Sequence, residues 1–144
     1  MPTVGHTIAK IVVATECELG EGPTWDAARQ RMLWLDVDGQ VLHELAADGR
    51  HMSTKLEQRV SAMVPDVAGG LVGIAGLDVT RFDNFGKAVS IIACLPPDGD
   101  GFANDGRCDP RGRLWVGTVD RSDAKAGSLF CVADDGTVTP VRDG

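Results

Sequence analysis

We expect no segment of this sequence to span a membrane or to act as a signal peptide. No run of about 18 apolar residues, the length of a membrane-spanning helix, occurs among its 144 residues. The first twenty residues show no long apolar stretch behind a basic start, which is the pattern of a signal peptide. We therefore expect a cytoplasmic protein with no membrane partner.

Basic clusters and paired cysteines are also missing. The chain has 14 Lys and Arg against 21 Asp and Glu, for a net charge of −7, so we expect no nucleic-acid partner. Its four cysteines, Cys17, Cys94, Cys108 and Cys131, are widely spaced and form no Cys-x-x-Cys pair. This spacing favours reduced thiols in a cytosolic protein, with a disulfide framework as the weaker alternative.

Helical periodicity is absent too, which predicts an all-β fold. No segment keeps an apolar 3.6-residue pattern over ten residues. The Asp-Gly pairs at 38–39, 48–49 and 135–136 predict hairpin turns, because both central residues of such a turn tolerate positive φ. The strands we expect are Lys10–Thr15, Gly22–Trp25, Met32–Val37, Gln40–Leu45, His51–Thr54, Val60–Val64, Leu71–Ala75, Asp78–Phe82, Ala88–Cys94, Ala103–Cys108, Leu114–Thr118, Ser128–Val132 and Thr137–Val141.

What the sequence does contain is a repeat. Asp26, Asp66 and Asp109 each stand in a turn before an apolar strand, and they recur roughly every 40 residues, which is typical of propeller blades. The chain then holds three four-stranded units, at about 16–58, 59–100 and 101–144. A sandwich or small barrel of twelve strands is the alternative, although it gives no reason for the period.

Three blades would leave a propeller open, because a closed ring needs about four to eight. Either the chain is part of a longer protein, or a second copy or partner completes the ring. We expect the two outer faces to be apolar, since blades pack through side chains such as Trp34, Leu71 and Trp115, with the two tryptophans at equivalent positions. With Lys10–Thr15 as a further open edge, residues 1–144 should not be a stable monomer.

The repeat also points to a site. The residues five places before the three aspartates are Glu21, Ser61 and Asn104, and all three are polar. Inner strands of a propeller enter at one mouth of its channel, so these residues could converge there on a ligand. The alternative is that they cap strand ends or bind water.

Other polar residues have simpler explanations. We expect His6, His43 and His51 at the surface, since no spacing among them suggests a metal pair. Asp36 and Asp38 flank a hairpin turn, and Asp98–Gly101 fits a surface turn better than a calcium loop.

Two long motifs carry a family resemblance. Glu16–Trp34 (ECELGEGPTWDAARQRMLW) and Asn104–Thr118 (NDGRCDPRGRLWVGT) are similar, in order and separation, to motifs of the SMP-30/gluconolactonase/luciferin-regenerating family. The resemblance extends from about Ile11 to the end of the chain. It implies a six-bladed propeller with one divalent metal ion (Ca, Zn, Mn or Mg) near its channel, and hydrolysis of small sugar-type lactones.

Carried over by position, the resemblance implies that Glu21 is a metal ligand and that Asn104 contacts the substrate. It implies no catalytic residue within this chain, because the remaining ligands and a catalytic aspartate belong to the second half of the fold. The chain thus resembles an N-terminal half-propeller. Two positions depart from the family pattern: Phe102 stands where many sugar lactonases carry an arginine, and Arg121 or Ser122 where an acidic residue is common, although Asp120 could replace it. A less hydroxylated lactone or an ester would suit this change.

Two hypotheses follow for function. The first is a metal-dependent lactonase whose remaining ligands come from a C-terminal half, with the 144 residues inactive by themselves. The second is a non-catalytic half-propeller that acts in binding or assembly.

Overall fold

The computed structural model describes residues 8–97, 101–121 and 127–142, and within them it contains twelve strands and no helix, which confirms the all-β prediction. Twelve of the expected strands are present, with ends within two residues of those predicted. They are β1 (Gly20–Asp26), β2 (Arg31–Asp36), β3 (Val41–Ala46), β4 (His51–Lys55), β5 (Ala62–Pro65), β6 (Leu71–Ala75), β7 (Asp78–Phe82), β8 (Ala88–Cys94), β9 (Phe102–Cys108), β10 (Leu114–Val119), β11 (Leu129–Val132) and β12 (Val138–Arg142).

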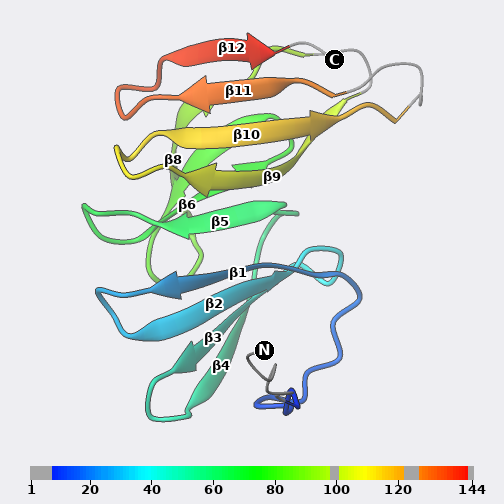
Figure 1. Cartoon of the computed structure of the whole chain (residues 1–144), viewed down its shortest axis with the longest axis vertical. Coiled ribbons are helices and arrows are strands. Elements are labelled where there is room, and N and C mark those ends of the chain that lie inside the picture. Colours follow the sequence, from blue (N-terminus) through cyan, green and yellow to red (C-terminus); the bar gives the residue numbers. More distant parts are fainter. Residues whose placement is uncertain (1–7, 98–100, 122–126, 143–144) are drawn as a thin grey trace, which may run out of the picture.

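The strands form three four-stranded antiparallel sheets in which each strand pairs with the next along the chain. We call them sheet 1 (β1–β4), sheet 2 (β5–β8) and sheet 3 (β9–β12). They stack along the long axis of the molecule with sheet 2 in the middle (Figure 1). The first strands of the sheets, β1, β5 and β9, lie side by side and run in the same direction (Figure 1). Their starting ends therefore meet on one side of the molecule.

The three repeat aspartates stand at hairpins: Asp26 is the last residue of β1, whereas Asp66 and Asp109 lie in the turns themselves. Asp66 and Asp109 each open a tight hairpin in which the backbone N–H of the aspartate donates to the carbonyl four residues on. Their carboxylates accept backbone N–H groups inside the turn, from Ala68 at 2.9 Å and Arg111 at 2.8 Å. Short polar side chains that bond their own turn in this way favour it over continued extension. The repeat period of the sequence is thus a period of capped hairpins.

The hairpin of Asp26 is one residue longer than the other two, and this changes the register. Its last turn residue is Gln30 (φ 52°), where the other hairpins have Gly69 (φ 99°) and Gly112 (φ 80°). A shift of one residue turns every side chain of a strand to the opposite face. At the predicted turn 38–39, similarly, the residue with positive φ is Gln40 (φ 50°) and not Asp38 or Gly39, where we expected it.

The predicted equivalence of Trp34 and Trp115 is therefore wrong. Counted from the end of each hairpin, Trp115 corresponds to Leu33, which faces sheet 2 together with Leu35. Trp34 lies on the opposite face of sheet 1, away from sheet 2. Trp115 lies on the face of sheet 3 away from sheet 2, because Leu114 and Val116 occupy the face that contacts sheet 2. Neither tryptophan packs between the described sheets.

Apolar side chains fill both junctions between sheets. Between sheets 1 and 2 the cluster includes Leu33, Leu35, Leu71 and Phe82, each at most 2% exposed. Between sheets 2 and 3 a second cluster contains Ile74, Val79, Leu114, Val116, Phe130 and their neighbours. Each such side chain stabilises the fold by about 1.5–3 kcal/mol through burial. Leu71, which we expected to pack between neighbouring repeat units, is fully buried at the first junction.

The outer faces are mixed in character rather than apolar. Trp34 stacks on His43 and His51, with ring centroids 5.0 and 5.4 Å away. His43 is only 8% exposed, so its expected surface position is wrong. The reason is that its strand position places it under the tryptophan ring on the same face of the sheet. His6 lies outside the described residues.

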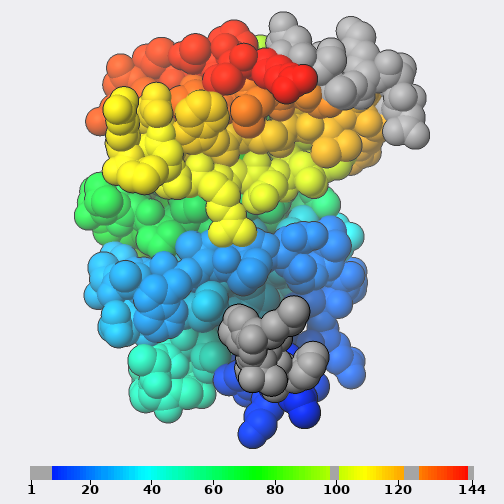
Figure 2. All heavy atoms as spheres, viewed as in Figure 1, coloured from blue at the N-terminus to red at the C-terminus, as the bar shows by residue number. Residues whose placement is uncertain are grey.

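The expected strand at Lys10–Thr15 is also wrong. Ile11 and Val12 are 86% and 80% exposed, and the segment joins no sheet among the described residues. A β-branched run becomes a strand only where a neighbouring strand satisfies its backbone. The backbone N–H groups of Glu18 and Leu19, which follow this segment, donate to the carboxylate of Asp36 in sheet 1. The first described residues accordingly lie at the sheet 1 end of the molecule (Figure 2).

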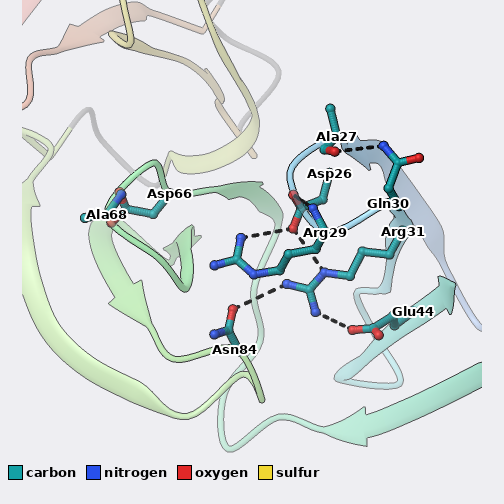
Figure 3. A network of polar contacts seen from close by, with 9 residues as sticks. All are labelled: Asp26, Ala27, Arg29, Gln30, Arg31, Glu44, Asp66, Ala68 and Asn84. Atoms are coloured by element: carbon teal, nitrogen blue, oxygen red, sulfur yellow. Dashed lines mark hydrogen bonds and ion pairs between the residues drawn. The ribbon is translucent and has the colours of Figure 1, made fainter.

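A polar network ties sheet 1 to sheet 2 at the turn end of β1 (Figure 3). The Arg31 guanidinium donates to Asp26 at 3.0 Å, to Glu44, and to Asn84 of the β7–β8 turn at 3.5 Å. Burial raises the pKa of Asp26, but the hydrogen bonds from Arg31 and Arg29 outweigh it and hold that pKa below its usual value. The network lies at the opposite end of β1 from Glu21, so its role is in the fold.

Candidate functional site

A small polar cavity lies where the starting ends of β1, β5 and β9 meet. Its volume is about 100 Å³, and its lining consists of Leu19, Glu21, Val37, Arg59, Ser61, Asn104 and Asp105. The three residues singled out by their spacing, Glu21, Ser61 and Asn104, are therefore brought together from three different sheets. The parallel course of the inner strands explains this, because it places equivalent positions side by side (Figure 1).

Glu21 and Asn104 both stand at β-bulges. The pairing of β1 with β2 is interrupted between Glu21 and Thr24, where Gly22 (φ 62°) supplies the left-handed residue. In β9, Asp105 pairs with Gly117 and Ala103 with Thr118, so Asn104 is the extra residue of the second bulge. A bulge re-aims a side chain relative to a regular strand and is common beside active sites.

These bulges belong to the strand interior. Asn104, Asp105 and Gly106 lie within β9, in agreement with the predicted strand Ala103–Cys108. Arg107 of the same strand donates to the carbonyl of Pro23 and the hydroxyl of Thr24, both at 3.3 Å. This contact fixes the β9 bulge region against the β1 bulge region across the inner strands.

The contacts of Ser61 favour the alternative that it caps a strand end over a role in ligand binding. Its side chain is buried, and its hydroxyl donates to the carbonyl of Ile74 at 3.3 Å, beside the backbone N–H of Ser61, which donates to the same oxygen at 2.8 Å. Ser61 thus extends the β5–β6 ladder by one residue. Glu21 and Asn104 make no comparable strand-end contact among the described residues.

Two residues of the cavity lining, Arg59 and Asp105, were not predicted from the sequence. Arg59 donates to Asp38 at 3.1 Å, and its guanidinium carbon is 5.9 Å from the ring centroid of Phe102. Arg121 approaches the same ring at 4.9 Å. Phe102, which stands where the resemblance implies an arginine, thus has two arginines from other segments beside it. Adjacency to Asn104 could have indicated Asp105, but no local signal connects residue 59 with residue 102.

The chemistry of the cavity suits a hard cation. Glu21 and Asp105 offer carboxylate oxygens and Asn104 offers an amide oxygen, the donors that Ca²⁺, Mg²⁺ and Mn²⁺ prefer. Among the described residues, no group of three or more His, Cys, Asp or Glu is placed to hold a metal ion. These side chains therefore fit part of a coordination shell.

Larger cavities lie elsewhere in the molecule, but they are weaker candidates for a functional site. One of about 500 Å³ lies between the β1–β2 and β5–β6 turns, at the opposite ends of the inner strands. Its charged groups are already paired, Arg29 with Asp26 and Asp66 with Arg81. Paired turn residues of this kind are explained by the fold.

Histidine and cysteine side chains lie away from the cavity. His43 Nδ1 is 3.1 Å from His51 Nε2, and Cys17 Sγ is 3.8 Å from His43 Nε2. Burial, together with the neighbouring histidine, lowers the pKa of His43. Desolvation, together with the nearby Asp109 and Asp66 carboxylates, raises the pKa of the Cys108 thiol. All four cysteines are free.

Fold and cavity together define an all-β repeat protein whose inner strands converge on one oxygen-rich polar site. No helix among the described residues is long and apolar enough to cross a membrane. The model of the SMP-30/gluconolactonase/LRE-like region matches residues 19–144. The chain belongs to this family, which confirms the resemblance seen in its motifs.

Relatives within the family include enzymes named for sugar lactones. The chain is 33% identical over 133 residues to the pentonolactonase XacC of Haloferax volcanii, covering 92% of this chain and 45% of that protein. It is 32% identical over 117 residues to the L-arabinolactonase of Azospirillum brasilense, covering 78% and 38%.

Among solved structures, a calcium-binding protein, the regucalcin of Agrobacterium tumefaciens, superposes with a TM-score of 0.80 at 32% identity, covering 92% of this chain and 46% of that one. The chain thus spans about half the length of the relatives it matches, or less.

Proposed function

We propose that this chain forms the N-terminal half of a six-bladed propeller that hydrolyses sugar-type lactones with the help of one divalent cation. The observation that carries the proposal is the convergence of Glu21 and Asn104, each at a β-bulge, on one cavity. The match to relatives named as lactonases supports the reaction class. The three sheets would be three blades, and their inner strands would line the channel.

In the proposed reaction, water adds to the lactone carbonyl carbon and the ring oxygen leaves as a hydroxyl group, which yields a hydroxy acid. A cation held by Glu21 would supply positive charge that polarises the carbonyl. Asn104 would orient the substrate by hydrogen bonds from its amide. Leu19 and Val37 form the apolar part of the cavity lining. The general base would come from the second half of the ring, since we assign no catalytic residue to this chain.

Completion of the ring is part of the proposal. Trp34 and Trp115 lie on the faces of sheets 1 and 3 that point away from sheet 2, and Ile8, Ile11 and Val12 are at least 80% exposed. The exposed Ile8, Ile11 and Val12 and the half-buried tryptophans favour association. A C-terminal half, or a second copy of the chain, would cover them. Sedimentation of residues 1–144 should show an assembly, and one well-folded species at 15.2 kDa would contradict this part.

The test of activity uses the native protein that contains this chain. We expect acid release from a panel of sugar lactones, stimulated by Mn²⁺, Ca²⁺, Zn²⁺ or Mg²⁺, and a loss of about 100-fold or more in Glu21→Gln. Glu57→Gln, at an exposed position outside the cavity, is the matched control. A rate of hydrolysis that does not change when metal is added, or full activity in Glu21→Gln, would refute the proposal of a metal-dependent lactonase.

A second candidate is a non-catalytic propeller for binding or assembly. Phe102 in place of an arginine, and the incomplete set of metal donors among the described residues, favour it. It predicts that the native protein assembles normally yet releases no acid from any lactone, with or without metal. A metal-stimulated rate that depends on Glu21 would exclude it.

A further inference from the structure

We infer that Arg59, held against Phe102 at the edge of the cavity, binds an acidic substituent of the substrate, so that the preferred lactones carry an anionic group at the end remote from the ring carbonyl. This inference rests on the proposed function for the lactone ring. Its anion-binding part stands on the geometry of the arginine and is tested separately below.

The position of Arg59 connects the cavity to a cationic rim. Its side chain lines the same cavity as Glu21 and Asn104. Its guanidinium carbon lies 5.9 Å from the centroid of the Phe102 ring, within the range of a cation–π contact. Such a contact orients the guanidinium through the face of the ring and consumes none of its five N–H donors. The contact with Phe102 therefore leaves these donors to hydrogen-bonding partners.

A carboxylate already occupies part of this donor set. Arg59 Nε and Nη2 each approach Asp38 Oδ1 at 3.1 Å. The two side chains are 43% and 50% exposed, and ion pairs in such positions contribute about 0–1 kcal/mol. A carboxylate or phosphate of a bound substrate can therefore replace Asp38 at low cost. Arginine suits this exchange because its planar fork matches both groups in bidentate geometry.

A second cation strengthens the positive field at the same place. Arg121 lies 4.9 Å from the Phe102 centroid and forms no ion pair within residues 8–97, 101–121 and 127–142. The lining of the cavity also carries the carboxylates of Glu21 and Asp105. A bound substrate would thus have both carboxylate oxygen donors and guanidinium groups within reach. This combination fits a molecule that offers a carbonyl group to the proposed cation and an acidic group to Arg59.

The test compares matched lactones on the native protein. Glucaro-1,4-lactone and glucono-1,4-lactone differ only in a carboxylate that replaces a hydroxymethyl group. We expect the ratio of their kcat/KM values to favour the acid and to fall about 10- to 100-fold in Arg59→Gln, the range for a lost hydrogen-bonded charge. Arg59→Lys should recover part of the ratio, because it restores the charge without the planar fork. Arg50→Gln, which replaces an exposed arginine between β3 and β4, is the control and should leave the ratio unchanged.

Equilibrium binding separates this inference from the lactonase proposal. Calorimetric titration with glucarate and gluconate should show tighter binding of the dianion, and Arg59→Gln should abolish the difference, whether or not any lactone is hydrolysed. A phosphorylated gluconate distinguishes an anion site in general from a carboxylate site. Equal binding of glucarate and gluconate by the unaltered protein, or an equal loss for both in Arg59→Gln, would overturn the inference.

Discussion

Replacement of Asp26 by asparagine gives a sharp test of how sheet 1 is held to sheet 2. The Asp26 carboxylate is 1% exposed and accepts hydrogen bonds from Arg31 at 3.0 Å, from the Arg29 side chain at 3.3 Å and from the Arg29 backbone at 3.1 Å. Arg31 then continues to Glu44 and to Asn84 of sheet 2 (Figure 3). Loss of the carboxylate charge leaves the buried guanidinium with Glu44 as its single anionic partner in the network.

The expected cost lies at the lower end of the range for breaking a buried ion pair. Such changes cost about 3–5 kcal/mol, and we expect about 3 kcal/mol because Glu44 still compensates Arg31. For a domain of this size that corresponds to a decrease in Tm of about 6–12 °C.

The effect should depend on pH in a defined direction. Burial raises the pKa of Asp26, but the hydrogen bonds from Arg31 and Arg29 outweigh it, so the folded-state pKa is depressed. A group with a depressed pKa contributes stability that is present above its unfolded value of about 3.9 and is lost as the pH falls through the folded value. The difference between the original protein and Asp26→Asn should therefore be complete at pH 7 and shrink below about pH 4.

Urea unfolding followed by the fluorescence of Trp25 and Trp34 measures this difference. Asp38→Asn is the matched control, because it makes the same chemical change in an exposed ion pair that should cost at most about 1 kcal/mol. Equal losses in the two variants, or a loss from Asp26→Asn that persists unchanged at pH 3, would refute the assigned role of the buried pair.

Three further predictions concern packing, turns and pH. Leu71→Ala, at a fully buried position, should lower the free energy of unfolding by about 2–5 kcal/mol, and a loss below 1 kcal/mol in urea would contradict the described junction. Gly70→Ala should lower the free energy of unfolding more than Gly112→Ala. Both residues have positive φ, which costs an alanine about 1–2 kcal/mol. At residue 70 the new Cβ would also lie 2.4 Å from the Phe82 carbonyl oxygen, whereas at residue 112 nothing lies within 4 Å. Equal Tm values for these two variants would remove that distinction. Because burial and a neighbouring histidine depress the pKa of His43, its contribution to stability should be present above about pH 6.5 and lost as the pH falls, so His43→Gln should flatten the dependence of the urea midpoint between pH 5 and 8.

Local chemistry made most of the secondary structure predictable. Turn residues such as Asp66 and Asp109 bond their own hairpins, so their effect is complete within five residues of chain. The short apolar runs between them can bury one face only as strands. The all-β class and the positions of twelve strands follow from these two effects. Counting back from the aspartates also selected Glu21 and Asn104, because repeats of equal length place equivalent residues side by side.

The sequence could not determine which face each strand presents or which side chains meet across sheets. One extra residue in the hairpin before β2 separates Trp34 from Trp115 in register, and periodicity alone does not reveal it. The burial of His43, the exposure of Ile11 and the approach of Arg59 to Phe102 all depend on partners distant in sequence. A strand signal resides in a few consecutive residues, whereas burial and convergence are properties of the packed sheets. Only the tertiary structure could decide them.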